Sequence, residues 1–435
     1  MNKKNIINGF DETFNININN KYIYISILAL TFINYFIKFE NINIFVIFLI
    51  CIAINILLIN KMNYKNKIII ILFFISFISK AIYSLFLLKN NIFPFEDSLT
   101  YLHHLDIMKD GFGIVSFKYV YNIAQSLHVG YHYFIYCIDF IFRNNYALYM
   151  ANVIMFQASS VLFLNYMEMM RFKRKIINIV ILFSLISFNM MIFTSNILKD
   201  SLVLFATMIT ICSYGAYKKG IYKSKNNIII IIILGLMILL FTRIYTCIAI
   251  MMGIMADYIV ADRNLVKLIK NRKINKKNIT ILLFTLVALY VLIKNTSIWM
   301  YVYAIANSLK DALSNIPMLV IGTIKELIRT FISPLPWNAI DNFDVYTVTA
   351  IDSTIAIVFG FALIMFVIKF IKFKEFRKIS YIYIIPIIVQ ASILGITYDS
   401  GSVRQRISIF LFMPLMYCIG FYYKENDKDK GIYKL

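Results

Sequence analysis

Charged residues, paired cysteines and the motifs of soluble enzymes are all scarce in this chain of 435 residues. Only 15% of its residues are charged, whereas 60% are hydrophobic. The five cysteines form no CxxC pair, so the sequence indicates neither a disulfide framework nor a zinc site. A glycine-rich nucleotide loop and a nucleophile elbow are also missing, which leaves direct use of a nucleotide or of a serine nucleophile unsupported.

The chain consists mainly of long apolar runs. Runs such as 67–88 and 227–241 carry almost no charge and are long enough, or nearly so, to cross a hydrocarbon core of about 30 Å. They do not alternate polar and apolar residues as barrel strands do, so they predict helices. We expect an all-α, polytopic transmembrane helical bundle of about 12–13 spans, forming a single integral membrane domain over 1–435. The expected spans are 22–38, 42–60, 67–88, 119–142, 145–168, 176–195, 201–217, 227–242, 245–261, 279–294, 353–371, 379–398 and 407–423.

The net charge of +22 comes mostly from Lys and Arg in short tracts between the apolar runs. This distribution follows the positive-inside rule, whereas a nucleic-acid-binding protein would carry a basic stripe on a soluble face. We therefore expect the lipid bilayer and no nucleic acid as a partner. The basic tracts and both termini are expected in the cytoplasm.

Two long segments are then expected outside the cell, with external interfacial helices. The first external loop is 89–118, and the large external loop 295–352 carries an amphipathic pattern that favours a helix in the headgroup plane. Between an external 89–118 and an internal Arg171 the chain must cross an odd number of times, yet two apolar runs lie there. The stretch 131–142 is short and contains Asp139, so a re-entrant or broken helix is one solution.

The charged residues expected outside are few and of mixed sign. Asp97, with Glu96 beside it, is the best candidate for a catalytic base, because a carboxylate near apolar surface can accept a proton from an attacking hydroxyl. Asp200 follows Lys199 where one expected span ends and the next begins. Both Asp97 and Asp200 also have an alternative role as helix caps.

Arginines are the candidates for binding a phosphate, because their planar fork suits its oxygens. Arg243 lies in a very short turn with Tyr245 beside it, and two more arginines lie at the external mouth of the last two spans. Contact between loop arginines and lipid headgroups is the alternative. The expected substrate-binding residues are Arg243, Arg404, Arg406, Lys199, Tyr245 and His104.

A metal site is only weakly indicated. His103 and His104 are adjacent, so on a helix they point about 100° apart and do not form a one-face ligand pair. We expect no metal and no cofactor, and a divalent cation held by Asp97 and Asp106 stays open as an alternative.

The pattern resembles two groups of bacterial membrane glycosyltransferases that act on polyprenyl-linked sugars. FEDSLTYLHHLDIMKDGF (95–112), GYHYFIYCIDFIF (130–142) and SNILKDSLVLF (195–205) resemble GT-C-type transferases, whose first-loop carboxylate is the catalytic base and would correspond to Asp97. Many members read Asp-Glu where this chain has Glu96–Asp97, and the Pro-rich start of the next helix is absent. The layout of the chain and SVRQR (402–406) resemble O-antigen and capsule repeat-unit polymerases, in which external arginines bind the lipid diphosphate.

This resemblance implies glycosyl transfer from a saccharide on undecaprenyl diphosphate or phosphate, at the outer face of the bacterial cytoplasmic (inner) membrane, in surface polysaccharide assembly. A polymerase is favoured because of the late loop and the lack of an appended domain. One alternative is a GT-C-type transferase that adds single sugars. Another is a lipid-linked oligosaccharide flippase or secondary transporter, against which the absence of an internal repeat argues. The implied partners are the lipid-linked saccharide and polysaccharide assembly proteins.

Overall fold

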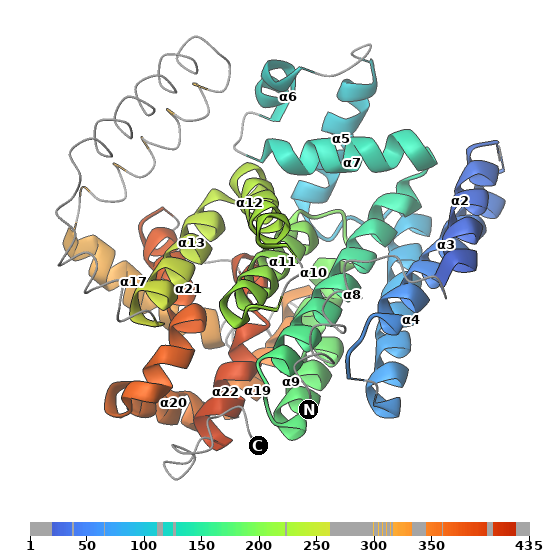
Figure 1. Ribbon diagram of the computed structural model, residues 1–435. Helices are drawn as coiled ribbons and strands as arrows, with labels where there is room; N and C mark the ends of the chain where they lie inside the picture. Colours follow the sequence, from blue (N-terminus) through green and yellow to red (C-terminus); the bar gives the residue numbers. More distant parts are fainter. Residues whose placement is uncertain are drawn as a thin grey trace.

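The computed structural model describes residues 20–261 except 37–38, 65, 111–115, 125–127 and 222–223, then 299, 303, 307, 310 and 314, and residues 316–422 except 333–344, 359 and 398–402. Within these ranges the protein forms helices and no strand (Figure 1). The helices are α2 (Lys21–Phe36), α3 (Glu40–Asn60), α4 (Lys67–Lys89), α5 (Glu96–Asp110), α6 (Phe117–Ala124), α7 (Val129–Phe142), α8 (Asn145–Met169), α9 (Arg174–Ile186), α10 (Phe188–Thr194), α11 (Asp200–Lys219), α12 (Lys225–Thr242), α13 (Ile244–Ala261), α17 (Ile316–Ile332), α19 (Val345–Val358), α20 (Gly360–Lys372), α21 (Lys374–Thr397) and α22 (Phe412–Tyr422), with a 3-10 helix η2 (Val403–Ile409).

Five of the described helices, α3, α4, α8, α11 and α12, are long and apolar enough to cross a membrane. Two bent pairs, α9 with α10 and α19 with α20, raise the number to seven if each pair is one span. Most of α8 and α11 is buried among other helices, whereas only 22% of α12 is buried. Exposed Ile, Leu and Phe side chains along α4, α12 and α20 form the kind of surface that lipid tails cover. The all-α polytopic helical bundle expected from the sequence is confirmed, and the expected span 279–294 lies outside the described residues.

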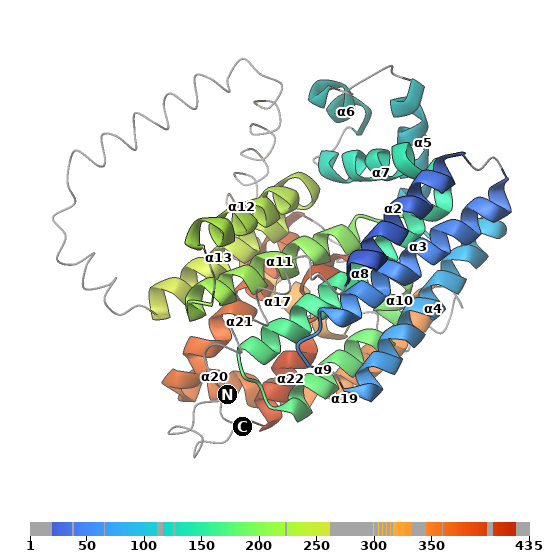
Figure 2. The same ribbon diagram turned by 45° about the vertical axis from the view of Figure 1, so that its right-hand side comes forward.

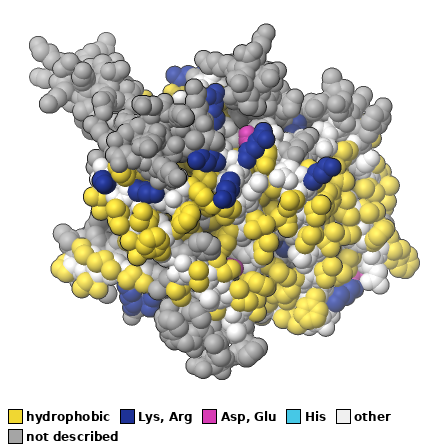
Figure 3. All heavy atoms as spheres, turned by 90° about the horizontal axis from the view of Figure 1, so that it is seen from below, with side chains coloured by type: hydrophobic (Ala, Val, Ile, Leu, Met, Phe, Trp, Pro, Cys, Tyr) yellow, Lys and Arg dark blue, Asp and Glu magenta, His cyan; other side chains and the backbone are white. Residues whose placement is uncertain are grey.

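The basic tracts meet at one end of the bundle. Arg174 lies over the Tyr64 ring, and Lys175 lies over the ring of Tyr422. Nearby, the backbone N–H of Asn63 donates to the side chain of Asn165 at 2.9 Å. We call this end the basic end. Lys and Arg side chains form a band beside a broad hydrophobic surface in Figure 3.

The opposite end carries the charged residues of mixed sign, and we call it the site end. The spans show that the two ends are opposite, because α4 and α12 begin in basic tracts while α11 ends in one at Lys219. The other termini of these helices are at Lys89, Thr242 and Asp200. A helix of 20 residues is about 30 Å long, so the two ends are separated by about the thickness of a hydrocarbon core.

Helices α5, α6 and α7 cover the site end. The single span expected over 119–142 is wrong, whereas the broken helix that the sequence left open agrees with α6 and α7, of 8 and 14 residues. In Figures 1 and 2, α7 lies across the ends of the neighbouring spans instead of running along them. Helix α8 then makes the one crossing between the site end and Arg171. One is an odd number, as the distribution of the basic tracts requires.

Helix α17 falls within the expected amphipathic segment and packs along α21. A Cβ atom at Gly322 would lie 2.3 Å from the backbone oxygen of Gly395, so glycine at both positions permits this close approach. Val320, Ile321 and Ile324 are exposed on another side of α17. Most of the expected loop 295–352 before Ile316 lies outside the described residues.

Candidate functional site

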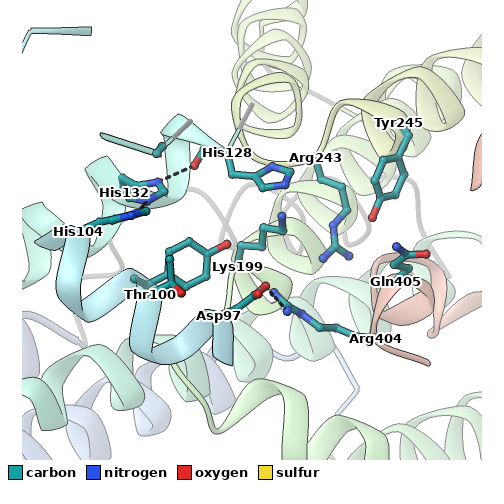
Figure 4. A pocket seen from close by; sticks show the side chains of 12 residues that line it. Asp97, Thr100, His104, His128, His132, Lys199, Arg243, Tyr245, Arg404 and Gln405 are labelled. Carbon is teal, nitrogen blue, oxygen red and sulfur yellow. Dashed lines mark hydrogen bonds and ion pairs between the residues drawn. The ribbon is translucent and has the colours of Figure 1, made fainter. Parts of the chain in front are cut away.

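A cavity of about 390 Å³ with charged residues in its lining opens at the site end, and the lining comes from segments far apart in the chain (Figure 4). Helix α5 contributes Asp97 and His104, and the residue before α11 contributes Lys199. The turn between α12 and α13 contributes Arg243, and η2 contributes Arg404. The lining residues are Asp97, Thr100, Tyr101, His104, Ala124, His128, His132, Lys199, Arg243, Tyr245, Arg404 and Gln405.

Buried polar contacts hold these segments in place. The Ser84 hydroxyl of α4 donates to the Ser195 backbone oxygen at 2.9 Å, and the side-chain amide of Asn152 in α8 donates to the Asn196 backbone oxygen at 2.5 Å. These two bonds hold the segment that leads to Lys199. On the other side of the cavity, the Gln390 amide of α21 donates to the Gln405 backbone oxygen at 2.8 Å. These contacts determine from which direction Lys199 and η2 reach the cavity.

Asp200 is the centre of the charge network and is fully buried. Its Oδ1 accepts a hydrogen bond from Arg243 Nη2 at 2.6 Å, and its Oδ2 accepts one from Arg404 Nε at 2.6 Å. Arg404 also donates through Nη1 to Asp97 Oδ2. Because both oxygens of Asp200 accept from arginines, its carboxylate serves the charge network and not the helix cap that the sequence left open. One carboxylate thus joins arginines 161 positions apart, which only the tertiary fold brings together.

The network contains more donors than acceptors. Arg243 is 1% exposed, yet its Nε and Nη1 have no hydrogen-bond partner among the described residues, and neither has Arg404 Nη2. A buried donor without a partner costs about 1–3 kcal/mol. Both arginines line the cavity, so oxygen atoms of a ligand there are the natural partners of these N–H groups.

Lys199 adds a third cation, and it is 7% exposed. Burial lowers the pKa of its ammonium well below the usual value, and the positive charges of Arg243 and Arg404 lower it further. Burial alone would also lower the pKa of Arg404, but the negative charge of Asp200 reverses this and raises it. The cavity therefore presents two permanent cations and one amine whose charged form a bound anion would stabilise.

The structure brings together most of the site residues expected from the sequence. Six of them line the cavity, and Asp200 is bonded to two of these six. Glu96, the first residue of α5, is exposed and does not line the cavity. The six lining residues are Asp97, His104, Lys199, Arg243, Tyr245 and Arg404.

Arg406 does not join the other two arginines, contrary to the expected role in binding substrate. Its Nη1 donates to the backbone oxygens of Thr330 at 3.0 Å and Arg329 at 3.4 Å. These carbonyls belong to the last turn of α17, where a cation is favourable. Arg406 therefore stabilises the C-terminus of α17.

Sequence reasoning missed Tyr101, His128 and His132, which also line the cavity. The two histidines are four positions apart at the start of the short apolar helix α7, a spacing that places them on one face. That spacing was the available signal. Asp139 of α7 forms an ion pair with Lys109 at 3.1 Å, away from the cavity.

Metal ligands do not gather among the described residues, where no group of three or more His, Cys, Asp or Glu side chains is arranged to hold an ion. Asp106 does not line the cavity and lies 3.5 Å from the ammonium of Lys109.

No family model matches the chain, and neither the curated proteins nor the solved structures contain a significant match to it.

Proposed function

We propose that this protein is a membrane glycosyltransferase that uses a saccharide carried on a polyprenyl diphosphate or phosphate, acting as a repeat-unit polymerase in surface polysaccharide assembly. The observation that carries the proposal is the set of buried, unpartnered guanidinium N–H groups of Arg243 and Arg404 at the cavity. A phosphate group offers several charged acceptor oxygens to such groups.

The charges of the cavity favour an anion. Among the described residues, Arg243, Arg404 and Lys199 are opposed by two carboxylates, those of Asp97 and Asp200. Charge that develops on a departing phosphate would be stabilised by these fixed cations, which are already in place before the reaction. This is the role that the proposal assigns to the arginines.

The lipid part of the substrate would lie against the helices beside the cavity. Helices α12 and α13 flank Arg243, and they expose Ile233, Leu234, Met237 and Met251. An isoprenoid tail would contact this apolar surface while its phosphate reaches the arginines sideways, between the helices.

The sidedness in the proposal follows from the basic end. The positive-inside rule assigns the end with the basic tracts to the cytoplasm. The cavity at the site end would then open to the extracytoplasmic side of a bacterial inner membrane, with both termini in the cytoplasm. A lipid-linked sugar reaches that side after it has crossed the membrane.

A test is the replacement of Asp97, Arg243 and Arg404 by alanine, one at a time, in cells whose surface polysaccharide is measured by length. If the protein is a polymerase, each variant leaves single repeat units on the surface. A transferase of single sugars would change composition and not length, and a flippase would leave nothing exported. The last outcome is disfavoured because the charges lie at the ends of helices, whereas transporters bind substrate near the midplane. Wild-type chain lengths in all three variants would refute the proposal.

A further inference from the structure

Two histidines form a hydrogen-bonded chain on the wall of the cavity opposite the arginines (Figure 4). His104 Nδ1 lies 3.0 Å from His132 Nε2, and His132 Nδ1 lies 3.1 Å from the backbone oxygen of His128. The two rings stack with their centroids 5.2 Å apart, and Tyr101 contacts the His132 ring edge-on. The side chain of His132 is thus held from several directions.

The hydrogen-bond partners determine which ring nitrogens of His104 and His132 carry a hydrogen. A carbonyl oxygen only accepts hydrogen bonds, so His132 Nδ1 carries a hydrogen and donates it. Neutral His132 then has a bare Nε2, which accepts from His104, and the hydrogen of His104 lies on Nδ1. The Nε2 atom of His104 therefore keeps its lone pair. In this tautomer an imidazole accepts a proton.

The surroundings keep the chain in this state. Burial lowers the pKa of His132 to about 4, so His132 remains a neutral acceptor near pH 7. Burial and the neighbouring His103 also lower the pKa of His104. When His104 takes up a proton, its Nδ1–H already points at the lone pair of His132, which stabilises the imidazolium.

Asp97, the base expected from the sequence, is engaged differently. Its Oδ2 accepts a hydrogen bond from Arg404 Nη1, so it belongs to the charge network. If Asp97 took up a proton during the reaction, it would lose the ion pair that helps to hold Arg404. No such conflict exists for His104, whose polar partner among the described residues is His132.

We propose that His104 is the general base of the transfer reaction and that His132 is its positioning residue; this inference rests on the function proposed above. The acceptor hydroxyl oxygen attacks the anomeric carbon and forms the new glycosidic bond, while its proton passes to His104 Nε2. The bond between the anomeric carbon and the phosphate oxygen breaks, and its electron pair leaves with the polyprenyl diphosphate. His104 afterwards releases its proton to water.

The test uses the purified full-length protein and lipid-linked repeat units extracted from a strain that lacks the gene. In His104→Asn, the amide nitrogen replaces Nδ1 as the donor to His132, but the base is gone. We expect turnover to fall about 10²–10⁴-fold, the usual contribution of a general base. Binding of undecaprenyl diphosphate, measured by native mass spectrometry, should not change. His103→Asn is the matched control, because His103 is exposed and does not line the cavity.

His132 is tested by two replacements. The oxygen of glutamine in His132→Gln can accept from His104, whereas His132→Phe offers no acceptor. Turnover lost in His132→Phe should therefore be largely restored in His132→Gln, a rescue that a merely space-filling role would not produce. Equal turnover of the two variants overturns the positioning role.

The outcomes separate this inference from the proposed function. Loss of turnover in His104→Asn with retained lipid binding supports it. Full turnover in His104→Asn, or a larger loss of turnover in Asp97→Asn than in His104→Asn while Asp97→Asn still binds the lipid, overturns the inference and leaves the proposed function intact. If the wild-type protein neither binds undecaprenyl diphosphate nor extends the repeat units, both fail.

Discussion

Replacing Asp200 by asparagine should both destabilise the protein and make it respond to an added anion. The carboxylate accepts two charge-assisted hydrogen bonds of 2.6 Å from Arg243 and Arg404 in a fully buried position. In the amide, one oxygen still accepts, but the NH₂ group faces a donor. Breaking a buried ion pair leaves an uncompensated charge and costs about 3–5 kcal/mol. We expect a loss of that size in the free energy of unfolding.

Unfolding can be measured by SDS titration of the purified protein in mixed micelles, with and without inorganic pyrophosphate. In Asp200→Asn, Arg243 and Arg404 line the cavity without the carboxylate that neutralised part of their charge, so pyrophosphate should restore part of the lost stability. At a concentration 100 times its Kd, a ligand adds about 2.7 kcal/mol. The wild-type protein should gain less, because Asp200 already neutralises part of the charge.

Asp257→Asn is the matched control. Asp257 is 2% exposed and accepts from Lys218 at 2.6 Å and from Tyr214 at 2.8 Å, near the basic end. This variant should lose stability without responding to pyrophosphate. Equal stability of Asp200→Asn and the wild type would refute the central role of Asp200. An equal response of both variants to pyrophosphate would refute the anion site.

Two further predictions concern neighbouring cations. Arg404→Ala should abolish binding of undecaprenyl diphosphate in native mass spectrometry, whereas Arg406→Ala should keep that binding and lose about 1–3 kcal/mol of unfolding free energy, because buried carbonyls of α17 lose their donor. Binding of the same lipid should take up a proton, since a phosphate raises the pKa of Lys199 from its lowered value in the free protein. The affinity should therefore fall as the pH rises above that free-state pKa. Calorimetry in two buffers of different ionisation enthalpy measures the uptake, and Lys199→Met should remove it.

The sequence could predict which end of the bundle carries the site. Apolar runs gave the helices, and the basic tracts separated the charges of one end from those of the other. Lys199, Arg243 and Arg404 each lie beside the terminus of a helix, so all three were expected on one side. That they meet at Asp200 follows from packing over separations of up to 204 residues, which no local pattern encodes.

The different roles of Arg404 and Arg406 could not be predicted from the sequence. They are two positions apart, and the sequence treats them alike. They lie in the 3-10 helix η2, in which residues two apart differ by about 240° in direction. One arginine therefore faces the cavity and the other faces the end of α17. A strand or an extended loop would have pointed both the same way.

His132 was missed because 119–142 is one of the expected spans, and the broken helix over 131–142 is an alternative without a place at the site. In a helix that crosses lipid, a histidine would face a packed interior with no relation to the first external loop. Once α7 lies across the site end, the same histidine falls beside α5 and within hydrogen-bonding distance of His104. The sequence required an odd number of crossings between 118 and Arg171 but showed two apolar runs. The run that does not cross is α7, which contributes His132 to the lining of the cavity.

The excess of donors at the cavity is better explained by binding than by stability. Two guanidinium groups bring about ten N–H donors, while the carboxylates of Asp97 and Asp200 accept three hydrogen bonds from them. A network selected only for stability would gain from a further acceptor, because each buried donor left over costs free energy. Asp200 holds both arginines in position, and their remaining donors are available to an anion. Adding a carboxylate beside Arg243 should therefore stabilise the protein and weaken its affinity for the lipid diphosphate.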